Sequence, residues 1–313
     1  MKDKYNRKVE YIRLSLTDKC NFRCNYCMNE EVKFMQDNEL LTLKEIEVLV
    51  KTLKDLNFKK IRLTGGEPTL RMDIVDVAKI IKKYFGTFSI TTNGSLMYYL
   101  ADELKKNGLN EVNFSLDSLN SENFKNITKR DELQNVLNGL EKSLKIGLKV
   151  KLNTVIQKRN LSEIFDLIEF AAKLNLPIRF IELMPIGKNY NDSDFISEKT
   201  LKDKIKEKYN LIPVKIKFGS GPSNYYLIKE LNSYIGFISA ITHNFCSSCN
   251  KIRISADGKI YPCLAFDYHI SIKDVILEED KLKEKIKFAI FEKPKRHYLS
   301  KLTKKTPMHK MGG

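Results

Sequence analysis

The chain has 313 residues, of which 42% are hydrophobic and 30% charged, and its 55 Lys and Arg against 39 Asp and Glu give a formal charge of +16. This composition is typical of a folded globular protein and excludes a disordered or collagen-like chain. No run of about 18 apolar residues occurs, and the start "MKDKYNRKVE" lacks the apolar stretch of a secretory signal. We therefore expect a cytoplasmic protein that makes no membrane contact.

The excess of positive charge favours an anionic partner, such as a phosphorylated small molecule, nucleic acid or a membrane surface. Lysines on solvated helix faces, as in "LKDKIKEKY", would explain the same excess without any partner.

The first two thirds of the chain alternate short apolar strands with amphipathic helices. Thr42 and Glu45 predict a capping box at the start of the first helix. Such alternation predicts a parallel sheet with right-handed crossovers. The strand-like segments are residues 11–17, 60–66, 88–94, 111–117, 148–157 and 178–184.

Six strand–helix units are fewer than the eight of a closed barrel. We therefore expect an α/β fold, an incomplete (β/α)6 TIM-like barrel with its ligand site at the carboxyl ends of the strands. The alternative is an open doubly wound sheet, but the glycine fingerprint of dinucleotide-binding sheets is absent from the sequence.

The character of the sequence changes after Pro185. A polar linker, "IGKNYNDSD", precedes a predicted helix near residues 197–209 and then several β-like segments. The last of these contains Asp257–Gly258, a signal for a hairpin turn. We expect a barrel over residues 1–190 and a β-rich C-terminal extension over residues 191–313.

The six cysteines form two groups of three. In a reducing compartment, tight cysteine groups are more often metal ligands than a disulfide framework. A structural zinc ion usually takes four protein ligands, whereas three cysteines on a four-iron cluster leave its fourth iron open to another molecule. A zinc knuckle with a distant fourth ligand is the alternative. The groups are Cys20, Cys24 and Cys27, spaced C-x3-C-x2-C, and Cys246, Cys249 and Cys263, spaced C-x2-C-x13-C.

The first triad, on the loop after the first strand, and "TGGEP" at the end of the second strand resemble the radical S-adenosylmethionine (SAM) superfamily. The resemblance implies a [4Fe–4S] cluster whose open iron is chelated by SAM, and a one-electron reduction that yields a 5′-deoxyadenosyl radical. It also implies that Tyr26, Gly66, Ser115 and Met184 bind SAM.

The second triad, the segment "NKIRISADGKIYPCL" and the terminal "MGG" are similar to the GTP 3′,8-cyclase family of molybdenum cofactor biosynthesis. The resemblance covers nearly the whole chain and implies a second [4Fe–4S] cluster whose open iron binds the guanine of GTP. The radical would then take hydrogen from C3′, and the ribose carbon would attack C8 to give 3′,8-cyclo-7,8-dihydro-GTP.

The same resemblance implies partners and substrate contacts. A one-electron donor would reduce the protein, cyclic pyranopterin monophosphate synthase would use its product, and the chain could form a homodimer. Arginine and lysine suit a triphosphate because they make charge-assisted hydrogen bonds. The family pattern assigns GTP contacts to Arg13, Arg62, Thr91, Lys151, Lys251, Ile252 and Arg253.

Two features of this pattern bear on catalysis, although no residue is assigned a catalytic role. Lys251 stands where the family has arginine, and lysine keeps the charge but loses the planar fork of donors. The family also implies that the terminal Gly312–Gly313 reaches into the active site.

Two other functions fit part of the sequence. A radical SAM peptide-modifying enzyme would also carry an auxiliary cluster, usually with more cysteines near its C-terminus. A zinc-containing nucleic-acid-binding protein would explain the charge and the cysteines, but it would explain neither the six strand–helix units nor "GGEP".

Overall fold

One curved sheet of twelve strands runs through the computed structural model, which describes residues 1–186, 190–299 and 306–312. Its strand order is β12-β11-β10-β1-β2-β3-β4-β5-β6-β9-β8-β7. The strands are β1 Tyr11–Ser15, β2 Lys60–Thr64, β3 Phe88–Thr92, β4 Leu109–Ser115, β5 Lys149–Ile156, β6 Ile178–Glu182, β7 Leu211–Val214, β8 Asn224–Ile228, β9 Ser233–Ile238, β10 Lys251–Ile254, β11 Lys259–Tyr261 and β12 Ile270–Ser271.

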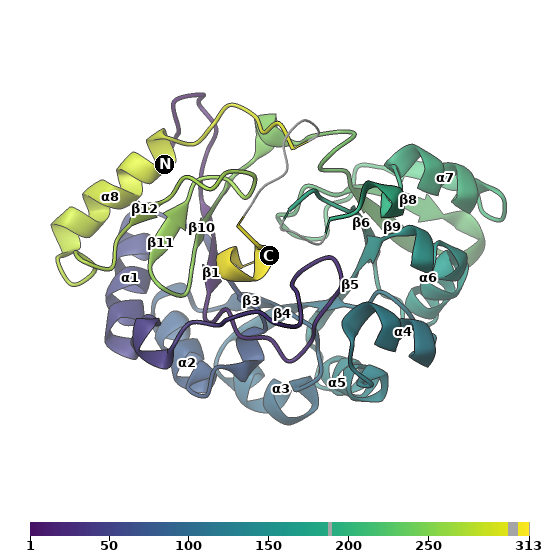
Figure 1. Ribbon diagram of the computed structural model, residues 1–313, viewed down its shortest axis with the longest axis horizontal. Coiled ribbons are helices and arrows are strands. Elements are labelled where there is room, and N and C mark those ends of the chain that lie inside the picture. Colours follow the sequence, from purple (N-terminus) through teal and green to yellow (C-terminus); the bar gives the residue numbers. More distant parts are fainter. Residues whose placement is uncertain (187–189, 300–305, 313) are drawn as a thin grey trace.

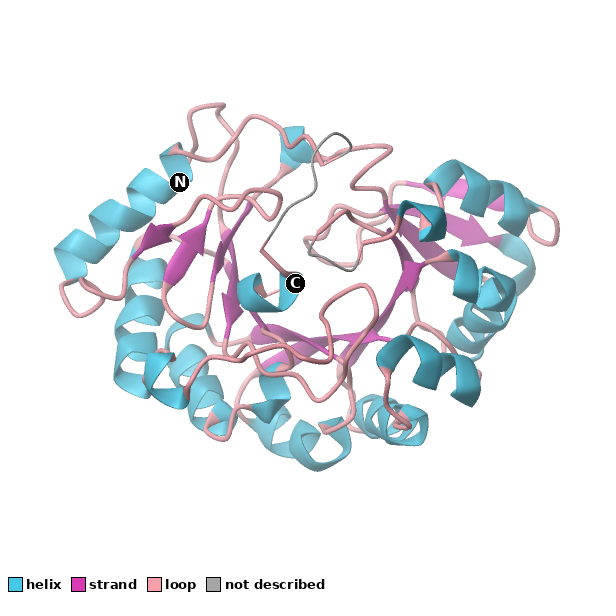
Figure 2. Ribbon diagram, viewed as in Figure 1, coloured by secondary structure: helices cyan, strands magenta, loops and turns pink. Residues whose placement is uncertain are grey.

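Strands β1 to β6 are parallel and adjacent in chain order, which confirms the six predicted strand–helix units. The sheet bends into a crescent with helices along its outer face (Figures 1 and 2). This is an incomplete TIM-like barrel. The helices are α1 Leu43–Asp55, α2 Ile74–Phe85, α3 Met97–Lys106, α4 Ser121–Thr128, α5 Leu133–Lys145, α6 Ile164–Lys173, α7 Glu198–Lys206 and α8 Glu279–Phe291.

The C-terminal strands extend both edges of this sheet. β9 lies parallel to β6, and β10 lies parallel to β1, so each edge gains one strand in the barrel direction. β8 and β7 then continue one edge, and β11 and β12 the other, as antiparallel strands. The predicted turn at Asp257–Gly258 joins β10 to β11, with Gly258 at φ +75°.

Strand alternation separates the core from the interior of the crescent. Ile12 and Leu14 of β1 are fully buried in the hydrophobic core, whereas Tyr11 and Arg13 line a cavity on the other side of the strand. Successive side chains point to opposite faces of a strand, so one strand supplies both the core and the site.

Local signals account for the first helix but not for every helix. The side chain of Thr42 accepts a hydrogen bond from the Glu45 amide, and the Glu45 carboxylate accepts one from the Thr42 amide at 2.7 Å, confirming the predicted capping box. Helices α4 and α8 were not predicted. Among the described residues, no helix is long and apolar enough to cross a bilayer.

Candidate functional site

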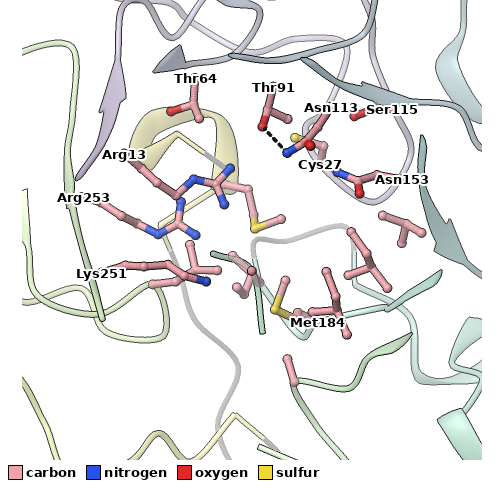
Figure 3. Close-up of a pocket in the computed structure, with 18 of the residues that line it drawn as sticks. Arg13, Cys27, Thr64, Thr91, Asn113, Ser115, Asn153, Met184, Lys251 and Arg253 are labelled. Atoms are coloured by element: carbon pink, nitrogen blue, oxygen red, sulfur yellow. Dashed lines mark hydrogen bonds between the residues drawn. The ribbon is translucent and has the colours of Figure 1, made fainter. Parts of the chain in front are cut away.

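A cavity of about 330 Å³ occupies the interior of the crescent and is lined by both cysteine triads. Most of the predicted ligand contacts come together there, from strands β1 to β4 and β10 and from the loops that follow β1, β2 and β6 (Figure 3). The predicted residues that line it, besides the six cysteines, are Arg13, Tyr26, Arg62, Gly66, Thr91, Ser115, Met184, Lys251 and Arg253.

Two predicted substrate residues lie outside the cavity lining. Lys151 is buried behind Glu111, with its Nζ 2.5 Å from Glu111 Oε2, and Glu111 itself lines the cavity. The Ile252 side chain is fully buried in the hydrophobic core, because alternation along β10 turns only Lys251 and Arg253 inward. A GTP contact by Ile252 stays a prediction.

The first triad follows β1 on a loop that runs along the cavity. Its thiols form no disulfide, and the Cys27 amide donates to the Cys24 carbonyl oxygen at 2.9 Å. Burial raises the pKa of Cys20 to about 12 and that of Cys27 to about 11. Thiolates are the form that binds metal, so this triad needs a bound cation to hold its charge.

The second triad lies in more positive surroundings. Burial alone would raise the pKa of Cys249, but the neighbouring Lys293 and Lys251 outweigh burial and lower it. The Lys293 ammonium donates to the carbonyl oxygens of Lys251 and Pro262 at 2.8 and 2.9 Å. Sequence reasoning missed Lys293, because nothing in "FEKPKRH" shows that this lysine is buried.

The donor sets suit iron–sulfur clusters. Thiolates are preferred ligands of iron–sulfur clusters, and each cysteine binds one iron, so three cysteines would hold three irons of a [4Fe–4S] cluster and leave the fourth open. Among the residues that the structure describes, no three Cys, His, Asp or Glu side chains converge closely enough to hold one metal ion. A single zinc ion would draw its thiolates to within about 4 Å of one another, whereas a four-iron cluster spreads them apart.

"TGGEP" fixes the loop that leads into the first triad. The amides of Gly66 and Glu67 each donate at 2.8 Å, to the carbonyl oxygens of Thr17 and Lys19 respectively. A Cβ on Gly66 would clash with the carbonyl oxygens of Asp18 and Lys19, so close packing of two main chains requires glycine here. The glycines thus position the cysteine loop, and Gly66 also lines the cavity.

Tyr26 is held in place from across the cavity. Its Oη donates to Asp117 Oδ2 at 2.7 Å, and Asp117 Oδ1 accepts from the Val155 amide at 2.8 Å. Burial raises the pKa of Asp117 to about 6. This contact ties the first cysteine loop to the end of β4, where Ser115 also faces the cavity.

Buried cations gather on the walls of the cavity. Arg179 of β6 is 5% exposed, and its Nε and Nη2 lack a partner among the described residues. Sequence reasoning missed Arg179, although it occupies an inward position of "IRFIELM". Burial lowers the pKa of Lys151 to about 8 and that of Lys251 to about 7, and the neighbouring arginines lower both further. Such crowded, desolvated cations would be stabilised by an anion.

The end of the chain enters the cavity between the two triads. Figure 1 shows the last short helix, Met308–Met311, inside the crescent. Arg253 Nη1 donates to the carbonyl oxygen of Gly312, and a Cβ on Gly312 would clash with Thr64 Oγ1. Gly312 therefore contacts two residues that line the cavity, Arg253 and Thr64, and Gly313 lies outside the described residues.

Comparison with known proteins agrees with this geometry. The radical SAM superfamily model matches residues 14–171, and the Molybdenum Cofactor Synthesis C model matches residues 176–299. A GTP 3′,8-cyclase of Clostridium perfringens is 42% identical over 100% of both chains. One of Marinobacter nauticus is 40% identical over 95% of this chain and 93% of its own.

Solved structures support the fold. Streptococcus suis SuiB bound to the precursor peptide SuiA aligns with a TM-score of 0.68 over 90% of this chain and 68% of its own, at 16% identity. Native anSMEcpe with bound AdoMet and Cp18Cys peptide aligns with a TM-score of 0.59 over 90% and 83%, at 18% identity.

A partial parallel barrel with three cysteines on its first loop defines a radical SAM enzyme, which binds SAM and iron–sulfur clusters. The match to curated relatives then extends through the second triad to the end of the chain. The chain belongs to the GTP 3′,8-cyclase family.

Proposed function

We propose that this chain converts GTP to 3′,8-cyclo-7,8-dihydro-GTP, the reaction named for its relatives. The observation that carries this proposal is the single cavity lined by two separate cysteine triads, with buried cations along the walls. When bound, the two [4Fe–4S] clusters and SAM supply the 5′-deoxyadenosyl radical and a coordination place for guanine.

The first triad and its surroundings would form the SAM side of the cavity. Cys20, Cys24 and Cys27 would hold the first cluster. Contacts to SAM would come from Tyr26, Gly66, Ser115 and Met184. The Tyr26–Asp117 hydrogen bond supports this assignment, because it fixes the aromatic ring beside the cysteine loop.

The second triad and the cations would form the GTP side. Cys246, Cys249 and Cys263 would hold the second cluster. The predicted contacts Arg13, Arg62, Thr91, Lys151, Lys251, Ile252 and Arg253, together with Arg179, would bind the nucleotide. The unpartnered Arg179 nitrogens support this, because buried guanidinium donors without partners are costly unless an anion binds them.

The remaining expectations are part of the same proposal. A one-electron donor would reduce the clusters, and cyclic pyranopterin monophosphate synthase would receive the product. We also propose a cytoplasmic location, a homodimer as one assembly and a division of the chain near residue 190. The six thiols support the location, since a reducing compartment keeps free cysteines available for clusters. The two family models support a division into two parts, although they place the boundary earlier, between residues 171 and 176.

The test is an anaerobic assay of reconstituted protein with SAM, a chemical reductant and GTP. We expect 5′-deoxyadenosine and the cyclised nucleotide to form together. A protein that holds both clusters and yields no 5′-deoxyadenosine in the presence of GTP would refute the proposal. A Cys249→Ala variant should keep the first cluster and form no cyclised product.

A further inference from the structure

One carboxylate stands among the buried cations of the cavity. Glu111 of β4 has a 19% exposed side chain and lines the cavity. It forms ion pairs with Arg62 Nη2 through Oε1 and with Lys151 Nζ through Oε2. We assign both partners to GTP binding. The Glu111 carboxylate therefore already pairs with the nitrogen donors that would bind the phosphates of GTP.

Three cationic side chains, those of Arg62, Lys151 and Arg179, lie near the single carboxylate of Glu111. Arg179 and Arg62 both lower the pKa of Lys151, and Glu111 raises it. Glu111 also raises the pKa of Arg179, as the hydroxyls of Tyr225 and Tyr11 do, against burial and Arg62. Two carboxylate oxygens can accept charge-assisted hydrogen bonds much as two phosphate oxygens do. Glu111 therefore resembles a phosphate group, because it is negatively charged and pairs with the same side chains that we propose to bind a phosphate.

A loop covers this ion pair from one side. Phe218, Ser220, Gly221 and Pro222 line the cavity, and Gly219 at φ +92° lies directly over the pair. A Cβ on Gly219 would lie 3.1 Å from Glu111 Oε2 and 3.3 Å from Lys151 Nζ. The loop shields the pair from solvent, and this strengthens the attraction between its charges. A phosphate that reaches Arg62 and Lys151 must therefore compete with Glu111 for them.

We propose that Glu111 is an internal counter-ion, which neutralises Arg62 and Lys151 in the nucleotide-free protein and yields them to a phosphate group on binding. This inference rests on the proposed function, since it assumes that the ligand is a nucleoside triphosphate. Glu111 then weakens triphosphate affinity below what the cations alone would give. The weaker affinity lets the product, which still carries its phosphates, leave the cavity.

The test compares nucleotide affinities of the holoenzyme and its Glu111→Gln variant by anaerobic equilibrium dialysis. Glutamine keeps the shape and one acceptor but removes the charge. We expect the variant to bind GTP roughly tenfold more tightly, GDP more tightly by a smaller factor, and guanosine with unchanged affinity. A Glu111→Asp variant keeps the charge and should gain no GTP affinity.

A matched control removes the same charge at the surface. Glu103 on α3 is 56% exposed and pairs only loosely with Lys106, at 4.0 Å, so Glu103→Gln should leave GTP affinity unchanged. Iron content and thermal unfolding of each variant confirm that it folds and holds its clusters.

The outcomes separate this inference from the proposed function. If wild-type protein prefers GTP to guanosine but Glu111→Gln binds GTP no more tightly, the counter-ion role is wrong and Glu111 only orients its partners. If wild-type protein binds GTP no better than guanosine, the triphosphate site itself is wrong and the proposed function fails with it.

Discussion

Arg253 donates a hydrogen bond to the carbonyl oxygen of Gly312, which joins strand β10 to the end of the chain inside the cavity. The contact places the tail between the two cysteine triads, where the substrate is proposed to bind. It also couples a predicted GTP contact to Gly312.

Replacing Gly312 should therefore impair turnover. Gly312 has φ +69°, and a side chain there would clash with Thr64, so Gly312→Val must displace the tail. We expect kcat to fall by roughly tenfold or more while both clusters are retained. Anaerobic turnover and iron analysis provide the measurement, with Lys310→Ala as a control on the same segment. Unchanged turnover in Gly312→Val would show that the tail has no role.

Arg7 supports the second triad from the N-terminal segment. Its guanidinium donates to the carbonyl oxygens of Cys246, Pro294 and Lys295 at 2.8, 2.7 and 3.0 Å, and it pairs with buried Asp3 at 2.6 Å. Arg7→Met would leave the Asp3 charge and these carbonyls without their partner. Breaking such a buried pair costs about 3–5 kcal/mol.

We expect Arg7→Met to lose the second cluster preferentially and to unfold at lower temperature. Iron content, the electron paramagnetic resonance of the two reduced clusters and thermal unfolding give the readouts. Lys4→Met, which removes a solvent-accessible lysine 3.9 Å from Glu292, is the matched control. Loss of both clusters in equal measure would contradict a local role.

The charge of Lys151 should make GTP use depend on pH. Burial lowers its pKa to about 8, and lysine is charged only below its pKa, so the charge that we propose to bind the triphosphate is lost as the pH rises through about 8. Since kcat/KM reports ionisations of the free enzyme, it should fall along this limb. The Lys151→Arg variant stays charged over this pH range. Its kcat/KM should therefore lack the part of the decrease that deprotonation of Lys151 causes. An identical pH profile in both proteins would count against the assignment.

The hydroxyl of Tyr26 should matter for SAM. Tyr26→Phe removes the hydrogen bond to Asp117 and leaves that buried carboxyl with one donor fewer. Losing this hydrogen bond should weaken SAM binding by about 1–2 kcal/mol, which raises the Kd for SAM roughly fivefold to thirtyfold. Titration of the reconstituted protein with SAM measures it. A variant that binds SAM as tightly as wild type would mean that the ring alone positions the ligand.

Local patterns predicted the parts of the fold that depend on neighbouring residues. The six strands of the partial barrel, the Thr42 cap and the turn at Asp257–Gly258 each have a signal within a few residues. The edge pairing of β9 with β6 and of β10 with β1 could not be predicted, because it joins segments far apart in the chain. Helices α4 and α8 were missed although each has buried apolar residues on one side.

The same distinction holds for the site. The cysteines, "TGGEP" and the inward arginines were predicted from spacing and resemblance. Glu111, Lys293 and Arg7 act through contacts with distant segments, which no spacing along the chain indicates. The predicted contact of Ile252 stays a prediction, and alternation along β10 places the side chain of this residue in the core.

The central claim is that the SAM side and the GTP side share one cavity, so that the adenosyl radical reaches C3′ of the ribose. Incubating the reconstituted protein with SAM, reductant and GTP deuterated at C3′ tests this claim directly. The account predicts that mass spectrometry will find the deuterium in 5′-deoxyadenosine. 5′-Deoxyadenosine formed with GTP present but without deuterium would contradict it.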